Sequence, residues 1–96
     1  MFEEYIGKRV IVRTYSAGVH FGTLAARDGK EVELQNTRRI WEWRGAFTLS
    51  AIALGGIVAG KLSEAIPSIL LTEAIEIIPC SEGASASLMD FRAHRP

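Results

Sequence analysis

The sequence predicts a mainly β (α+β) fold, in the form of a small meandering antiparallel sheet or a partly open barrel with one or two short helices. Short runs rich in β-branched residues alternate between apolar and polar positions, and turn signals separate them about every ten residues. Only two brief stretches show helical spacing. A chain of 96 residues suits one folding unit, so we expect a single β-rich domain over residues 1–96.

The first half of the chain reads as strands joined by tight turns. Residues 8–14 alternate as a strand, and residues 19–26 resume the extended pattern. Asp28 and Gly29 predict a hairpin of type I′, in which both central residues need positive φ. Residues 31–35 form the next strand, and after a bend at Asn36 and Thr37 the sequence predicts a fourth strand over residues 38–44.

The second half predicts one helix, a long loop, two strands and a final helix. The first helix begins at Phe47 or Thr48, with Thr48 as a plausible N-cap, and stops at Gly55 and Gly56. A loop is expected over residues 57–67, then strands over 68–72 and 74–78, and a helix over 82–91 capped by Ser81. The run "GKRVIV", then "GTL", then "DGKEVEL" is similar to SH3-like and Sm-like small barrels.

Charge and cysteine content restrict the functional classes. Eleven basic and eleven acidic residues give no formal net charge, so any anion site must be local. The single cysteine, Cys80, excludes an internal disulfide and favours a reducing compartment. Glu3 and Glu4 stand where an export signal needs positive charge, and the uncharged segment 45–60 is too short to span a membrane. We expect a protein of the cytoplasm, with no membrane partner.

Catalytic chemistry has little support in the sequence. His20 and His94 lie far apart, and neither stands at metal-ligand spacing from Cys80, which reads as a small buried hydrophobic residue. The glycine-rich stretch 55–60 follows a helix and opens none, which argues against a phosphate-binding loop. We therefore expect no enzyme, no catalytic residue, no metal and no cofactor.

The segment "RRIWEWR", residues 38–44, holds both tryptophans and three arginines. Alternation places Arg39, Trp41 and Trp43 on one face of a strand, and this face points outward if Ile40 enters the core. Aromatic rings beside a guanidinium suit a nucleotide, since the rings stack on a base and arginine binds phosphate.

A second set of such residues surrounds the small-residue turn between the first two strands. Its backbone N–H groups, with the flanking side chains, also suit an anion. We expect a homo-oligomer with pockets at or near subunit boundaries for a phosphorylated adenine-type ligand. The candidate residues are Arg13, Arg38, Arg39 and Arg44 for phosphate, Tyr15, Trp41 and Trp43 for stacking, and His20 for a polar contact.

Structural roles compete with each of these assignments. Trp41 and Trp43 equally fit a core or a subunit contact, and His20 alone more often serves as a structural hydrogen-bonding residue. Arg38 and Arg44 also fit solvated side chains, or partners of Glu42 and Glu64.

Three stretches carry a family resemblance: "VIVRTYSAGVHFGTL", "RRIWEWRGAFTLSAIAL" and "TEAIEIIPCSE". Together they resemble a family of small proteins encoded by bacteriophages and prophages. The general character is similar to phage anti-defence "sponges", which sequester nucleotide signals of Thoeris or CBASS immunity, such as cyclic ADP-ribose isomers or cyclic oligonucleotides. The resemblance implies binding without turnover in the host cytoplasm. Two alternatives remain: an Sm-like RNA-binding oligomer, and a structural or host-takeover phage protein with no small-molecule ligand.

Overall fold

The computed structural model describes residues 3–44 and 48–93. A 3₁₀ turn, η1 (Glu3–Tyr5), precedes the sheet. The strands are β1 (Arg9–Thr14), β2 (Val19–Asp28), β3 (Glu31–Arg44), β4 (Ala59–Leu62), β5 (Ile66–Leu71) and β6 (Ala74–Pro79), and the helices are α1 (Leu49–Gly55) and α2 (Glu82–Asp90). No helix within the described ranges is long and apolar enough to cross a membrane.

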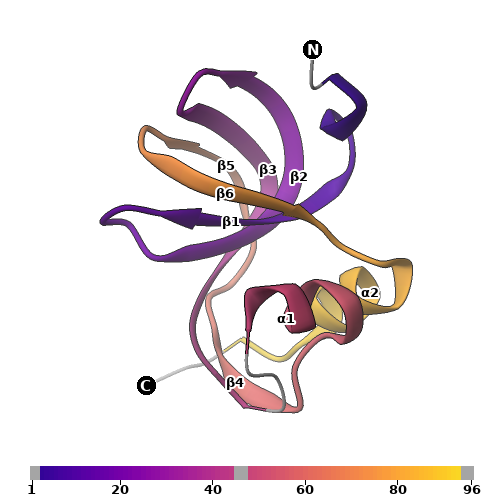
Figure 1. Cartoon of the computed structure of the whole chain (residues 1–96). Coiled ribbons are helices and arrows are strands. Elements are labelled where there is room, and N and C mark those ends of the chain that lie inside the picture. The colour runs from indigo at the N-terminus through magenta and orange to yellow at the C-terminus, as the bar shows by residue number, and fades with distance from the viewer. Residues whose placement is uncertain (1–2, 45–47, 94–96) are drawn as a thin grey trace.

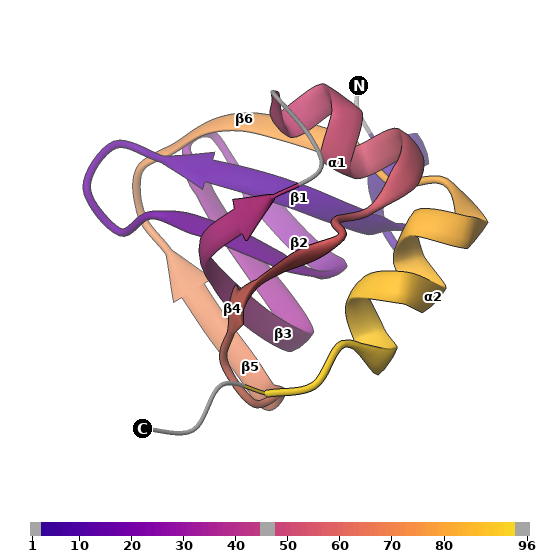
Figure 2. The ribbon, with the colours of Figure 1, turned by 90° about the horizontal axis from the view of Figure 1, so that it is seen from below.

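The strands form one antiparallel sheet that curls into a half-barrel (Figure 1). Its order is β4-β3-β2-β1-β6, and β5 pairs with the first part of β3. The long strand β3 therefore carries both β4 and β5 along one side, as the view from below shows (Figure 2). The predicted fold class is confirmed: the chain is a partly open barrel with two short helices.

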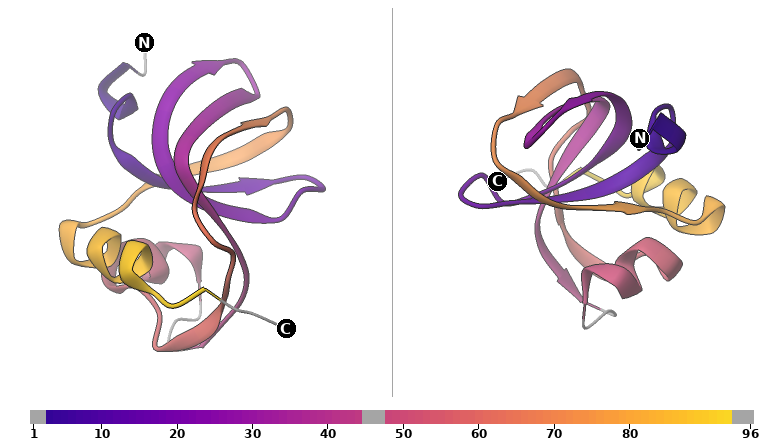
Figure 3. Two further views of the ribbon diagram at one scale, coloured as in Figure 1. Left: turned by 180° about the vertical axis from the view of Figure 1, so that it is seen from behind. Right: turned by 45° about the horizontal axis from the view of Figure 1, so that its top comes forward.

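Two apolar clusters fill the structure, one on each face of the sheet. The barrel interior holds Val10, Val12, Leu24, Val32, Leu34 and Leu71. On the opposite face lie both helices (Figure 3). They enclose a second cluster against the sheet, the helix-side core, which contains Ile11, Phe21, Ile40, Ile52, Leu62 and Leu88. Because β1 contributes to both clusters, its alternating residues are buried in turn on opposite faces.

Several local signals give the structures expected from them. The Thr48 and Ser81 side chains accept hydrogen bonds from the N–H groups of Ala51 and Ala84, so both are N-caps. Gly56, with φ of 76°, ends α1 as expected. Phe47, the other possible start, lies outside the described residues.

Three expectations are corrected. The segment 57–67 is not one loop, because it contains β4 and the start of β5. The bend at Asn36 does not end a strand: Asn36 takes a φ of 48° and β3 continues through a shift of register. The hairpin is not type I′ either. Its two loop residues are Gly29 and Lys30, and only Gly29 has positive φ, the pattern of type II′.

Candidate ligand-binding site

A bulge in β3 separates the two tryptophans. Between Ile40 and Glu42 the register against β4 slips by one residue, since Ile40 pairs with Leu62 and Glu42 with Lys61. Alternation therefore restarts after Trp41. Trp41 is 49% exposed, whereas Trp43 packs against the helix-side core. The prediction that both rings share an outward face is wrong for this reason.

A glycine in β4 allows the two strands to approach at this bulge. Gly60 pairs with Trp43, and an added Cβ there would collide with the Glu42 carbonyl oxygen and lie 2.8 Å from the Trp43 Cα. On the outer surface, Lys61 Nζ lies 3.4 Å from Glu42 Oε2. The backbone contact at Gly60 thus fixes the position from which the Trp43 ring extends.

Trp43 lines a hollow of about 360 Å³ beside the start of α1, which we call the α1 hollow. It lies on the helix side of the sheet, where β1, β2, β3 and β6 meet the first turn of α1. Its apolar residues Val19, Trp43, Leu49 and Ile78 all pack against the helix-side core. Thr48 and Ser50 add hydroxyl groups. The hollow therefore offers an apolar floor with polar groups at its edge.

The charged part of the α1 hollow is an ion pair between neighbouring strands. Arg13 and Glu76 stand opposite each other in the β1–β6 ladder, and Arg13 Nη1 donates to Glu76 Oε1 at 3.1 Å. Both side chains are about half exposed. Such a pair contributes little to stability because water screens it. It does, however, hold a guanidinium and a carboxylate side by side.

Arg38 is buried, being only 3% exposed, and its guanidinium binds main-chain carbonyl oxygens. Its Nε donates to Ser63 at 2.7 Å, and its Nη1 donates to Leu88 at 2.7 Å and to Met89 at 3.3 Å. Burial lowers the pKa of this guanidinium. Arg38 thus connects β3 to the last turn of α2, and we leave it out of the candidate site.

His20 is also buried, and it stabilises the turn between β1 and β2. Its Nε2 donates to the Ala17 carbonyl at 2.9 Å, while the Ala17 N–H donates to Thr14 Oγ1 at 2.8 Å. The pKa of His20 is lowered chiefly by burial; the bond to Ala17 raises it in part, and the charge of Arg39 lowers it further. The Ala17 N–H is therefore occupied, and His20 acts structurally here.

The remaining four predicted residues lie at the surface, and none of them lines the α1 hollow. Tyr15 is 77% exposed, and Arg39, Trp41 and Arg44 are exposed as well. Of the eight predicted residues, Arg13 and Trp43 line the α1 hollow together. Sequence reasoning missed Glu76 and the apolar floor, although the alternation of β6 already puts Glu76 on the same face as Ile78.

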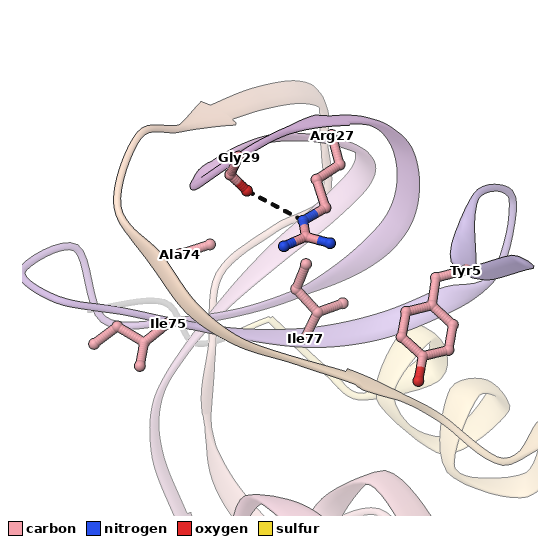
Figure 4. A pocket seen from close by; sticks show the side chains of 6 residues that line it. All are labelled: Tyr5, Arg27, Gly29, Ala74, Ile75 and Ile77. Atoms are coloured by element: carbon pink, nitrogen blue, oxygen red, sulfur yellow. Dashed lines mark hydrogen bonds between the residues drawn. The ribbon is translucent and has the colours of Figure 1, made fainter. Parts of the chain in front are cut away.

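Two other hollows differ from the α1 hollow in size or lining. One lies between the β2–β3 hairpin and β6, where Arg27 Nε donates to the Gly29 carbonyl at 3.1 Å (Figure 4). Tyr5 and Arg27 line it beside apolar side chains, but its volume of about 200 Å³ is below the range of about 300–1,000 Å³ that is usual for small-molecule sites. The other, of about 530 Å³, includes Lys8, Arg9 and Cys80 but no aromatic side chain. Burial raises the pKa of Cys80 to about 11, so its thiol stays protonated at neutral pH. Among the described residues, no group of three or more His, Cys, Asp or Glu side chains is placed to hold a metal ion.

The curled antiparallel sheet with two short helices defines a small Sm-like barrel. Its fold is similar to that of a heptameric archaeal Sm protein, with a TM-score of 0.57 over 82% of this chain and 94% of that chain, at 16% identity. Residues 7–88 match the domain of unknown function DUF6948, and the chain belongs to this family. No curated protein matches the chain. The family description carries no activity, so the phage origin and the sponge role stay predictions.

Proposed function

We propose that the protein is a homo-oligomer that binds a nucleotide in the α1 hollow and holds it without chemical change. The observation that supports this function is the meeting of Trp43, Arg13 and an apolar floor in one hollow. A volume of about 360 Å³ lies within the range of about 300–1,000 Å³ that is usual for small-molecule sites.

The residues of the hollow match the parts of a nucleotide. An aromatic ring that stacks on a base contributes about 1–3 kcal/mol, and a base has apolar faces that suit the floor formed by Val19, Leu49 and Ile78. The Arg13 guanidinium supplies directed donors, and the hydroxyls of Thr48 and Ser50 can bond to sugar or base atoms. These groups bind and orient a ligand.

Retention of a bound signal is the biological role that agrees with this chemistry. The sequence resembles phage anti-defence proteins that sequester nucleotide immune signals, and such a role needs a binding site and no turnover. Under this proposal the ligand is a cyclic ADP-ribose isomer or a cyclic oligonucleotide in the cytoplasm of the host cell. The ligand occupies the α1 hollow of each subunit, with one site per chain.

Two free sheet edges support the homo-oligomer. In the ladders of the described residues β5 pairs only with β3 and β6 only with β1, so each has an outer edge without a ladder partner. At the start of β6 the Ala74 N–H donates to the Lys30 carbonyl, and the rest of this strand has no second ladder. Exposed apolar side chains mark both edges, among them Ile66 and Leu70 on β5 and Ile75 on β6. Exposed apolar edges favour pairing with another chain, and the similar Sm protein is heptameric. We propose that copies of this chain associate through these edges.

Replacing Leu70 with lysine is expected to dissociate this assembly. Leu70 is 63% exposed on β5, so the change leaves the fold of one subunit intact while it brings charge to the apolar edge. Native mass spectrometry should show the monomer mass for Leu70→Lys. The matched control is Leu54→Lys, at an exposed site on α1 away from both edges, which should keep the mass of the wild-type assembly. Equal masses for the two variants would contradict the edge contact.

Replacing Trp43 with leucine is expected to weaken nucleotide binding by roughly tenfold or more, because it removes the stacking ring. The control is Trp41→Leu, which changes the same residue type outside the hollow. Titration calorimetry with a panel of nucleoside monophosphates, cyclic dinucleotides and cyclic ADP-ribose isomers measures both. Circular dichroism confirms that each variant is folded. Equal affinities of the wild-type protein and Trp43→Leu would remove the α1 hollow from the proposal.

Single-stranded RNA is a second candidate ligand, favoured by the other face of β3. Arg39 and Trp41 are both exposed, and alternation places them on the same side of this strand. Stacking of bases on Trp41 with phosphate contacts from Arg39 would suit an Sm-like oligomer. If RNA is the ligand, Trp41→Leu should lower the affinity for RNA, and the affinity of the wild-type protein should fall steeply as the salt concentration rises. Binding of RNA that is unaffected by Trp41→Leu would exclude this face.

A further inference from the structure

The carboxylate at the edge of the α1 hollow restricts what Arg13 can bind. Glu76 Oε1 lies 3.1 Å from Arg13 Nη1, so the two charges cancel locally. A phosphate placed against Arg13 would also face the carboxylate of Glu76, and like charges at such a distance repel. The charged edge of the hollow therefore suits a neutral group better than it suits an anion.

A neutral group that satisfies both side chains must offer acceptors and donors on neighbouring edges. A guanidinium presents paired donors, and an ionised carboxylate accepts through two oxygens. Arg13 and Glu76 occupy directly opposed positions of adjacent strands, so both side chains can contact a ligand from the same side. The matching ligand has two adjacent acceptors beside two adjacent donors in one plane.

Among the nucleobases, guanine alone has this arrangement. Its O6 and N7 form the acceptor pair that arginine reads, and its N1–H and N2–H₂ groups form an adjacent donor pair for a carboxylate. Adenine offers the N6–H₂ group beside acceptors but has no second donor next to it. Cytosine and uracil also lack two adjacent donors. A planar purine also matches the stacking surface of Trp43 and the apolar floor.

We infer that the α1 hollow is selective for a guanine base, with Arg13 on its O6/N7 edge, Glu76 on its N1/N2 edge and Trp43 against its face. This inference rests on the nucleotide-binding function proposed above. It excludes the adenine-type ligand expected from the sequence, cyclic ADP-ribose isomers included, and of the two ligand classes proposed above it leaves a cyclic oligonucleotide that contains guanine. Arg13, predicted from the sequence to contact phosphate, is here assigned to the base. Glu76, which no sequence pattern singled out, becomes the residue that sets the base preference.

Calorimetric titration of the full chain with guanosine, inosine and adenosine 5′-monophosphates tests the selectivity. The guanine nucleotide should bind at least tenfold more tightly than the adenine nucleotide. The inosine nucleotide, which lacks the N2 amino group, should bind with intermediate affinity. Equal affinities for the guanine and adenine nucleotides would overturn the inference.

The variant Glu76→Gln separates a base contact from a phosphate contact, because the two assignments predict opposite changes. With guanine in the hollow, glutamine offers one acceptor and a conflicting NH₂ group, so affinity for the guanine nucleotide should fall roughly tenfold. If Arg13 instead binds phosphate, removal of the carboxylate should raise affinity, and that result would overturn the inference. The control Glu73→Gln alters an exposed carboxylate in the β5–β6 turn, outside the hollow. It should leave the affinities for the guanine and adenine nucleotides unchanged.

Failure of the inference differs from failure of the proposed function. Nucleotide binding that depends on Trp43 but shows no base preference would overturn the guanine assignment and leave the binding function in place. Absence of binding by every nucleotide tested, with folded protein, would overturn both. Thermal unfolding followed by circular dichroism establishes that Glu76→Gln is folded, as expected for a half-exposed side chain.

Discussion

Replacement of Arg38 by methionine is expected to lower the free energy of unfolding by about 3 kcal/mol, because three carbonyl oxygens lose their donor. Arg38 is buried and donates to Ser63, Leu88 and Met89. Methionine fills similar space without donating, so the carbonyls stay buried and unpaired. For a chain of this size the melting temperature should fall by roughly 12 °C or more.

Urea unfolding at a fixed protein concentration measures this loss, and Arg39→Met is the matched control. Arg39 is the exposed neighbour of Arg38, so its replacement should change the free energy of unfolding by less than about 0.5 kcal/mol. Arg38→Lys keeps the charge but loses the fork of donors, and should give an intermediate loss. If Arg38→Met unfolded at the urea concentration of the wild-type protein, the role of Arg38 in joining β3 to α2 would be refuted.

The buried arginine shows one limit of prediction from sequence. Helix α2 has no basic residue in its own last turn, and its terminal carbonyls need donors. The donor comes instead from Arg38 on β3, 50 residues before Leu88 in the chain. Local patterns cannot reveal such a contact, because nothing in the segment "RRIWEWR" predicts which of its three arginines is buried against the helices.

Features that depend on neighbouring residues were predictable from the sequence. The alternation of β1, the N-caps Thr48 and Ser81 and the stop at Gly56 all follow from short-range chemistry, and the structure confirms them. These elements suffice for the fold class, because short alternating strands with tight turns have few other ways to bury both faces. The hairpin at Gly29 was predicted, although its turn type was not.

The candidate site depended on strand register, which the sequence does not contain. Arg13 meets Glu76 only because β6 pairs with β1 in one particular alignment. The bulge after Ile40 moves the side chain of Trp43 to the opposite face of the sheet. A prediction based on strict alternation of side chains cannot include such a bulge, because the bulge adds one unpaired residue to the strand. One signal was present: a glycine inside a strand, as Gly60 is in β4, marks close approach of another backbone.

Replacement of Gly60 by alanine is expected to destabilise the protein by about 3 kcal/mol, because the new methyl group meets backbone atoms that cannot move aside cheaply. The Cβ would collide with the Glu42 carbonyl oxygen and lie 2.8 Å from the Trp43 Cα. Relief of the collision requires β4 to separate from β3 at the bulge. Chemical unfolding followed by circular dichroism measures the loss, and an unchanged unfolding midpoint would show that the strands have room here.

The control for this change is Gly55→Ala, at the end of α1, where an added Cβ meets nothing within 4 Å. Alanine there should leave stability within about 1 kcal/mol of the wild-type value, and should raise it if anything. Because Gly60 pairs with Trp43, Gly60→Ala should also displace the ring from the α1 hollow and weaken nucleotide binding at temperatures where the variant is still folded. A folded Gly60→Ala variant with wild-type nucleotide affinity would mean that the bulge does not position Trp43 for the ligand.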